Sequence, residues 1–377
     1  MQQIRLRNRA IAVPMPDHRI AVIGILLSAV TAAALLQPVP TPSFTSLRLL
    51  IHEAAPSSHA AEDLVQSLGG EVTRPLPLIG GFAATVPEGR LPVLQRDPSI
   101  EDVSVDGRVQ MAAVGTDAWD DLDPNLAWRK AIRLGQVPDG IDGRGVTVAL
   151  IDTGVARVAD LGDRVLARVD FTPGGNGEDA YGHGTHLAGI IAGNGAASLG
   201  KWRGVAPGAN LVSLKVAGPD GSTDVSVVIA ALQWVVVHRA EHGIKVLNLA
   251  FGTDSVQPYA LDPLNAAVER AWAAGITVVV SAGNRGPGTV NKPGDDPYVI
   301  TVGAVDVNRT ADRKDDEVAP FSSSARTVDG FAKPDLVAPG TTIVATRDAG
   351  STIDSLHPDA VLDGSYFKGT GTSQAGA

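Results

Sequence analysis

Three polar residues stand in surroundings that suit nucleophilic catalysis. Ser373 lies among small residues at the expected start of a helix, so the backbone of another molecule could approach its hydroxyl closely. A serine hydroxyl is a weak nucleophile and needs an adjacent base. His183, flanked by two glycines, is the candidate base, because an unperturbed histidine titrates near about pH 6.5. Asp152, at the end of an apolar run, is the candidate acid that would orient the imidazole.

Each of these residues also has a structural explanation, because serine often caps a helix, aspartate often closes a turn and a lone histidine is usually structural. The three occur, however, in one order and in three separate motifs, at 148–154, 182–186 and 369–377. This order with these flanks resembles the subtilisin-like (subtilase) serine peptidases, in which the acid, the histidine and the serine follow one another in the same way. The resemblance covers about residues 140–377.

The resemblance implies roles for four residues. Ser373 would be the nucleophile, His183 the general base and then the general acid, and Asp152 the partner that fixes the histidine tautomer. Asn284, just after an apolar run, would donate its amide to the carbonyl oxygen as negative charge develops there, with an asparagine in a left-handed turn as the alternative. His186 is expected to be a structural neighbour, since no His-Glu-x-x-His motif and no cysteine accompanies it.

The resemblance also implies that a peptide is held by backbone hydrogen bonds between two edge strands. Phe251 stands where the family usually has leucine, and it would either alter a pocket wall or belong to the core. The expected substrate-binding residues are Ala250, Phe251, Gly252, Gly221, Ser222 and Thr223.

Short apolar runs alternate with segments of helical spacing from Gly145 onward. This alternation predicts an α/β fold whose mostly parallel sheet carries helices on both faces, as in the subtilisin-like fold. Active groups then gather at the carboxyl ends of the strands. Strands are predicted at 146–151, 210–216, 245–251, 276–281 and 299–305, and helices at 183–192, 225–238 and 263–274.

The N-terminal third has a different organisation. Residues 1–37 carry a basic start and an apolar run, which indicates a signal peptide or a signal anchor, and residues 38–45 are expected to be a linker. The β-α-β-β-α-β pattern of 46–110, with its last strand at 103–109, predicts a small α+β, ferredoxin-like domain. Its position resembles that of the family's inhibitory propeptide, with an ordinary binding domain as the alternative. Residues 111–139 would then be a joining segment with any processing site near its start, followed by the catalytic domain at 140–377.

Composition limits the partners and cofactors. A formal net charge of −10 argues against nucleic acid and anionic lipid as main partners. The expected partners are polypeptide substrates, the chain's own propeptide as an intramolecular inhibitor, and a membrane only if the N-terminal segment is retained. The absence of cysteine excludes disulfides and thiolate metal sites. No cofactor or metal is expected for catalysis; the resemblance allows a structural calcium ion but matches no ligand loop.

The stretch around Ser373 departs from the family pattern in two places. Gln374 and Ala377 stand where the family usually has methionine and proline. Relatives continue with a buried helix, so we expect a chain that ends at Ala377 to be less active than an extended form.

The function that the sequence predicts is that of a secreted serine endopeptidase zymogen, with a catalytically silent peptide-binding protein as the alternative. A lipase with the same triad is disfavoured, because no Gly-x-Ser-x-Gly elbow surrounds Ser373.

Overall fold

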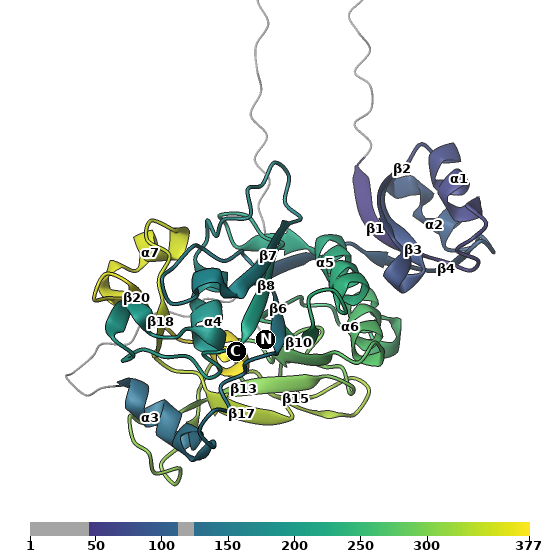
Figure 1. Ribbon diagram of the computed structural model, residues 1–377. Coiled ribbons are helices and arrows are strands. Elements are labelled where there is room, and N and C mark those ends of the chain that lie inside the picture. The colour runs from purple at the N-terminus through teal and green to yellow at the C-terminus, as the bar shows by residue number, and fades with distance from the viewer. Residues whose placement is uncertain (1–44, 112–123) are drawn as a thin grey trace, which may run out of the picture. The chain divides into compact units, whose positions relative to one another are not determined.

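The computed structural model describes residues 45–111 and 124–377 of the chain (Figure 1). The predicted signal segment 1–37, nearly all of the predicted linker 38–45 and the expected processing region after Met111 lie outside these residues. No helix in the described ranges is long and apolar enough to cross a membrane.

A central sheet of eight strands dominates the larger part of the chain, as the alternation of apolar runs and helical segments predicts. Its order is β14-β13-β12-β10-β6-β8-β7, and β17 also pairs with β13. These pairs are parallel except that of β13 with β14. The strands are β6 (Thr147–Asp152), β7 (Val165–Asp170), β8 (Asn210–Lys215), β10 (Ile244–Leu249), β12 (Thr277–Ser281), β13 (Ile300–Asp306), β14 (Glu317–Val318) and β17 (Leu336–Pro339).

Strand β6 explains why helices cover both faces of the sheet. Ala149 and Ile151 belong to one apolar cluster with α5 and α6, whereas Val148 and Leu150 belong to a second cluster with α3 and α4. Successive side chains of a strand point to opposite faces, so a strand that is apolar throughout needs two covering layers. Figure 1 shows α4 on one side of β6 and α5 and α6 on the other. These helices are α3 (Pro124–Ala131), α4 (His183–Ala192), α5 (Val225–His238) and α6 (Pro263–Ala273).

A smaller three-stranded sheet precedes the helix that contains Ser373. Its order is β18-β20-β19, and β20 leads into the short helix α8. The hydroxyl of Thr346, on β18, donates to the carbonyl of Thr185 at 2.6 Å, which ties this sheet to α4. The elements of this region are β15 (Ala325–Arg326), β16 (Ala332–Lys333), β18 (Ile343–Thr346), α7 (Thr352–Leu356), β19 (Val361–Leu362), β20 (Tyr366–Gly369) and α8 (Thr372–Gly376).

Residues 46–105 form an α+β unit with its own apolar core, as the pattern of the sequence predicts. Its antiparallel sheet has the order β2-β3-β1-β4, which with the intervening helices gives the split β-α-β topology. The elements are β1 (Ser46–Glu53), α1 (Ala60–Ser67), β2 (Glu71–Leu76), β3 (Gly81–Pro87), α2 (Leu91–Leu94) and β4 (Ile100–Val105).

The single strand predicted at 103–109 is wrong, because the chain turns at Asp106 and Gly107. Strand β4 ends at Val105 and a separate strand, β5 (Arg108–Met111), begins after the turn. Asp106 is drawn out of the strand by α5, since its carboxylate accepts from the N–H of Ser226 at 2.9 Å and from its hydroxyl at 2.8 Å. Strand β5 then pairs antiparallel with both β9 (Ser222–Asp224) and β11 (Phe251–Gly252).

The burial of α5 makes a first testable prediction. Leu232 is fully buried in the cluster beneath this helix, so Leu232→Ala should lower the free energy of unfolding by about 2–5 kcal/mol through lost contacts and a cavity. Val237 lies on the same helix with 65% of its surface exposed, so Val237→Ala should change it by less than about 0.5 kcal/mol. Denaturant unfolding of both variants measures the difference, and equal losses would contradict the packing described above.

Candidate active site

The carboxylate of Asp152 and the imidazole of His183 lie against each other. Asp152 is the last residue of β6 and His183 the first residue of α4, so the two meet at the carboxyl edge of the sheet. The Nδ1 atom of His183 is 2.8 Å from Oδ1 and 3.0 Å from Oδ2 of Asp152. Both side chains are buried. This geometry holds the ring so that its other nitrogen, Nε2, faces away from the acid.

The pKa of His183 is raised above its ordinary value. Burial lowers the pKa, because it penalises the charged ring, but the carboxylate of Asp152 opposes this through its charge and its hydrogen bond and prevails. The charge of Asp179 acts in the same direction. The site therefore stabilises a protonated imidazole, which is the form that a general base produces when it takes a proton.

The two glycines beside His183 allow a backbone conformation and a close contact that other residues would not. Gly182 has φ +101°, a left-handed conformation that residues with a Cβ rarely adopt. Gly184 packs so closely that an added Cβ would lie 2.1 Å from the carbonyl oxygen of Gly154. The structure requires these glycines for the sharp entry into α4 and for its contact with the turn after β6.

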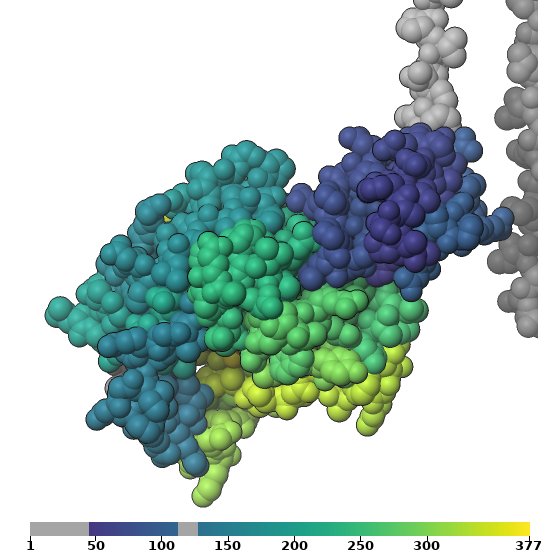
Figure 2. Space-filling model, turned by 45° about the vertical axis from the view of Figure 1, so that its right-hand side comes forward, coloured from purple at the N-terminus to yellow at the C-terminus, as the bar shows by residue number. Residues whose placement is uncertain are grey.

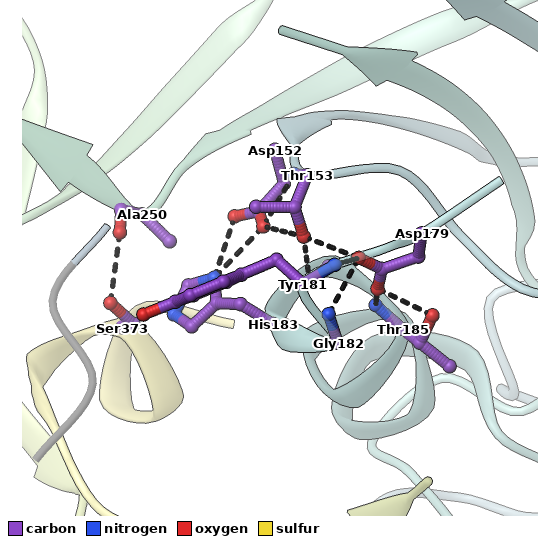
Figure 3. A network of polar contacts seen from close by, with 10 residues as sticks. Asp152, Thr153, Asp179, Tyr181, Gly182, His183, Thr185, Ala250 and Ser373 are labelled. Atoms are coloured by element: carbon purple, nitrogen blue, oxygen red, sulfur yellow. Dashed lines mark hydrogen bonds and ion pairs between the residues drawn. The ribbon is translucent and has the colours of Figure 1, made fainter. Parts of the chain in front are cut away.

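Ser373 lies near the start of α8 and is fully buried. Its hydroxyl donates to the carbonyl of Ala250 at 2.9 Å (Figure 3). The Nε2 atom of His183 has no hydrogen-bond partner in the described ranges. Of the two contacts that the sequence predicts for His183, the bond to Asp152 is present in this form and the bond to Ser373 is not, because the serine hydroxyl is taken by Ala250.

Gly369 shows how closely α8 and α4 approach. A Cβ added to Gly369 would lie 2.6 Å from Nε2 of His186 and 2.7 Å from Nε2 of Gln374. His186 is one turn beyond His183, and Gln374 follows Ser373 directly. The structure therefore brings the helix with the candidate base and the helix with the candidate nucleophile together.

Asn284 is oriented by Thr372. Its Oδ1 atom accepts from the N–H of Thr372 at 2.8 Å and from the hydroxyl at 2.9 Å. The same hydroxyl accepts from the N–H of Gly283 at 3.1 Å. Because the oxygen end of the amide is held in this way, the NH₂ end points in a fixed direction beside the residue that precedes Ser373. Thr372 is thus a further residue of the site, which its hydroxyl next to Ser373 could have indicated from the sequence.

The six residues expected to bind a peptide line both sides of β5. Ser222 and Thr223 belong to β9 and pair with Gln110 and Val109, and Gly221 accepts from the N–H of Met111 at 2.9 Å. On the other side Phe251 and Gly252 form β11, which Ala250 precedes. Phe251 is only 2% exposed and packs in the main apolar cluster, so its side chain belongs to the core rather than to a pocket wall.

Asp179 is the other residue that the sequence analysis missed. It is buried and accepts hydrogen bonds from Thr153 and from the first turn of α4. Asp179 lies three residues before the N-cap position of α4, which is Gly182, so the usual capping pattern does not point to it and the sequence carried no local signal for this residue.

No three acidic or histidine side chains in the described part of the chain gather as metal ligands do. Calcium also binds backbone and amide oxygens, so the structural calcium ion that the resemblance allows stays an expectation.

The fold and the site together define an α/β protein built around a buried Asp–His pair with a serine on an adjacent helix. The model of the subtilase family matches residues 143–377. Serine protease AprX of Bacillus subtilis (strain 168) is 41% identical over 255 residues, which are 66% of this chain and 57% of AprX. Subtilisin Savinase of Lederbergia lenta is 37% identical over 221 residues, which are 58% of this chain and 72% of Savinase.

The chain belongs to the subtilase family. Its fold is similar to that of fervidolysin from Fervidobacterium pennivorans, a keratinolytic enzyme related to subtilisin, with a TM-score of 0.67 at 24% identity. That match covers 88% of this chain and 53% of fervidolysin. This chain thus spans little more than half the length of AprX and of fervidolysin.

His186 is a buried histidine that stays neutral. Burial, together with the charge of the neighbouring His183, lowers its pKa to about 3. Its ring packs edge-on against Phe367, with 6.2 Å between the ring centres. These surroundings agree with a packing role for the residue.

The neutral state of His186 predicts a pH effect on stability. In the unfolded chain this histidine binds a proton below about pH 6.5, whereas the folded chain resists protonation until about pH 3. Its contribution is therefore complete above pH 6.5 and is lost as the pH falls toward 3. We expect His186→Leu to reduce the drop in thermal midpoint between pH 7 and pH 4. His59→Leu, at an exposed position, should leave that drop nearly as in the wild type; an unchanged drop in His186→Leu would show that the ring titrates normally.

Proposed function

We propose that this chain is a serine endopeptidase of the subtilase family, made as a zymogen and exported, which hydrolyses peptide bonds through an acyl-enzyme intermediate. The observation that carries the proposal is the buried bond between Asp152 and Nδ1 of His183, beside the helix of Ser373, in a chain of this family. A serine hydroxyl is a weak nucleophile, and a histidine oriented by a carboxylate is the base that it needs.

In the proposed mechanism the hydroxyl of Ser373 leaves Ala250 and attacks the carbonyl carbon of the scissile bond while its proton passes to Nε2 of His183. Asp152 stabilises the imidazolium and keeps the tautomer. The oxyanion receives hydrogen bonds from the side chain of Asn284 and the N–H of Ser373. His183 then protonates the leaving amine. Water, activated by the same histidine, hydrolyses the acyl-enzyme and restores the free serine.

The pairing of β5 supports an inhibitory role for the N-terminal unit. Strand β5 lies between the two strands to which substrate binding is assigned, and its backbone uses the hydrogen bonds that a bound peptide would make. Ser373 is 0% exposed in this arrangement, so a substrate has no access to it. A zymogen has both properties, and residues 46–111 are therefore proposed to act as its propeptide.

The same unit also makes polar contacts with α5, the green helix that meets the purple N-terminal surface in Figure 2. The carboxylate of Asp106 accepts from the N–H and the hydroxyl of Ser226, in the first turn of that helix. Arg48 forms an ion pair with Asp224, and the N–H of Leu78 donates to the side chain of Gln233 at 3.1 Å. These contacts fix the unit on the helical layer while β5 fills the strand position.

Further parts of the proposal rest on the sequence. Export is proposed because the apolar segment in 1–37 would act as a signal peptide or a signal anchor. The proposed substrates are polypeptides, which would be bound through their main-chain hydrogen-bonding groups. The acidic net charge supports neither nucleic acid nor an anionic membrane surface as a partner. The chemistry above uses side chains alone, so no cofactor is proposed for it, and structural calcium stays an expectation.

A catalytically silent peptide-binding protein is the rival function, and a fluorophosphonate probe separates the two because only an activated serine reacts quickly with it. Because Ser373 is inaccessible in the zymogen, the test uses the chain after residues 46–111 have been removed. We expect it then to be labelled at Ser373 and Ser373→Ala to stay unlabelled. Asn284→Ala should hydrolyse a peptide with kcat lowered by about 10²–10³-fold and KM little changed. Peptide binding without labelling or hydrolysis would favour the rival.

The inhibitory role predicts that residues 46–111, added in trans, inhibit hydrolysis by a preparation from which this unit has been removed. Asp106→Ala leaves the first turn of α5 without its acceptor, which costs about 1–3 kcal/mol, so its inhibition constant should rise about tenfold or more. Glu101→Ala, at an exposed position of β4, is the matched control and should inhibit like the unaltered segment. Equal inhibition by all three segments would contradict the role of Asp106, and none at micromolar concentration would contradict the propeptide assignment.

A further inference from the structure

A second buried carboxylate, Asp179, stands beside the Asp–His pair and is used by no step of the mechanism. It lies in the loop that leads into α4 and is 3% exposed. Its partners come from two other places, Thr153 in the turn after β6 and Thr185 in the first turn of α4. Figure 3 shows the dashed contacts that run from Asp179 through Thr153 to Asp152 and on to His183.

Both oxygens of Asp179 act only as acceptors. Oδ1 accepts from the hydroxyl of Thr153 at 2.8 Å and from the N–H groups of Gly182 and Tyr181 at 2.7 and 3.2 Å. Oδ2 accepts from the N–H and the hydroxyl of Thr185 at 2.8 and 2.6 Å. A neutral amide of the same shape would turn an NH₂ group toward one of these sets of donors, so only a carboxylate satisfies both.

These contacts replace the side-chain cap of α4. The residue at the N-cap position is Gly182, which has no side chain to accept from the first turn. The N–H of Thr185 is satisfied by Asp179, and the N–H of Gly184 by the hydroxyl of Thr153 at 2.9 Å. A negative charge at this end of a helix is also favoured by the helix dipole. Since His183 is the first residue of α4, the groups that hold this turn also orient its ring.

The same carboxylate reaches the acid of the pair through one residue. The hydroxyl of Thr153 donates to Asp179 and lies 3.2 Å from Oδ1 of Asp152. The N–H of Thr153 donates to that same Oδ1 at 2.8 Å. The turn that carries the acid and the helix that carries the base are therefore tied to one buried group.

Resting on the peptidase function proposed above, we propose that Asp179 is a positioning residue that holds Asp152 and His183 in the geometry that proton transfer requires. A misplacement of about 1 Å can lower a rate by about 10²-fold, so a group that fixes both partners matters even though it touches no substrate. Asp179 also acts on the charge of the site. Burial lowers the pKa of His183, whereas the charge of Asp152 and then that of Asp179 raise it. Two further titratable groups lie nearby, the ring of His186 on the same helix and the phenol of Tyr181.

The test compares Asp179→Asn with Asp262→Asn, each made in the full chain and assayed after residues 46–111 have been cleaved off. Asp262 is a buried cap of α6 that accepts from the N–H groups of Leu264 and Asn265 at 2.9 and 3.3 Å, so the same substitution is made at a buried helix cap away from the site. We expect Asp179→Asn to lower kcat about 10²-fold with KM little changed, and to shift the acid limb of the kcat/KM profile to lower pH. Asp262→Asn should lower only the thermal midpoint.

The outcomes separate this role from the proposed function. A wild type that, with residues 46–111 removed, neither hydrolyses peptide nor reacts with fluorophosphonate overturns both. An active wild type with an equally active Asp179→Asn variant, or an Asp262→Asn variant with the same loss of kcat, overturns the positioning role alone.

A second pair of variants decides the case if Asp179→Asn does not fold. Thr153→Val keeps the shape of the side chain and deletes the hydroxyl that joins Asp179 to the turn of Asp152, whereas Thr153→Ser retains that hydroxyl. We expect the valine variant to lose most of kcat and the serine variant to keep it. Equal kcat in these two variants overturns the proposal.

Discussion

A buried imidazole accepts a proton readily only if a negative charge lies against it, and this constraint governs the region around His183. Water would supply the stabilisation at a surface, but here the ring is buried and Asp152 must supply it. The acid therefore has to stand at a fixed place, which the carboxyl end of a central strand provides. The base has to face it from a rigid element, which the first turn of α4 provides. The packing of the sheet between two helical layers is what keeps these two positions fixed.

The constraint extends outward from the pair through groups that touch neither ring nor substrate. Gly184 lets α4 approach the turn after β6, and Asp179 and Thr153 satisfy the N–H groups at the start of the helix. Thr372 orients Asn284 by donating a hydrogen bond to the oxygen of its side-chain amide. In each case a small polar or missing side chain determines where a larger one points. Buried polar groups of this kind are costly unless every donor is satisfied, so the network tolerates little change.

Strand β5 shows how the same edges that would read a substrate can also be occupied by the chain itself. Its pairing with β9 and β11 uses main-chain hydrogen bonds, which do not depend on the identity of the side chains. Asp106 and Arg48 add contacts with α5 and its N-cap that do depend on side chains. The proposed zymogen thus combines a general blocking strand with specific anchors outside the cleft.

The sequence by itself determined the fold class and the positions of the major strands and helices, and it named the residues of the candidate site. Short apolar runs, helical spacing of apolar residues and flanking glycines are local properties, so β6, α4, α5 and α6 could be predicted from them. The tertiary structure decided what depends on contacts between distant segments. It broke the strand predicted at 103–109, because α5 draws Asp106 away, and it directed the hydroxyl of Ser373 to Ala250 rather than to His183. It also gave Asp179 its importance, since the five donors that converge on this carboxylate come from a turn, a loop and a helix whose meeting no local pattern records.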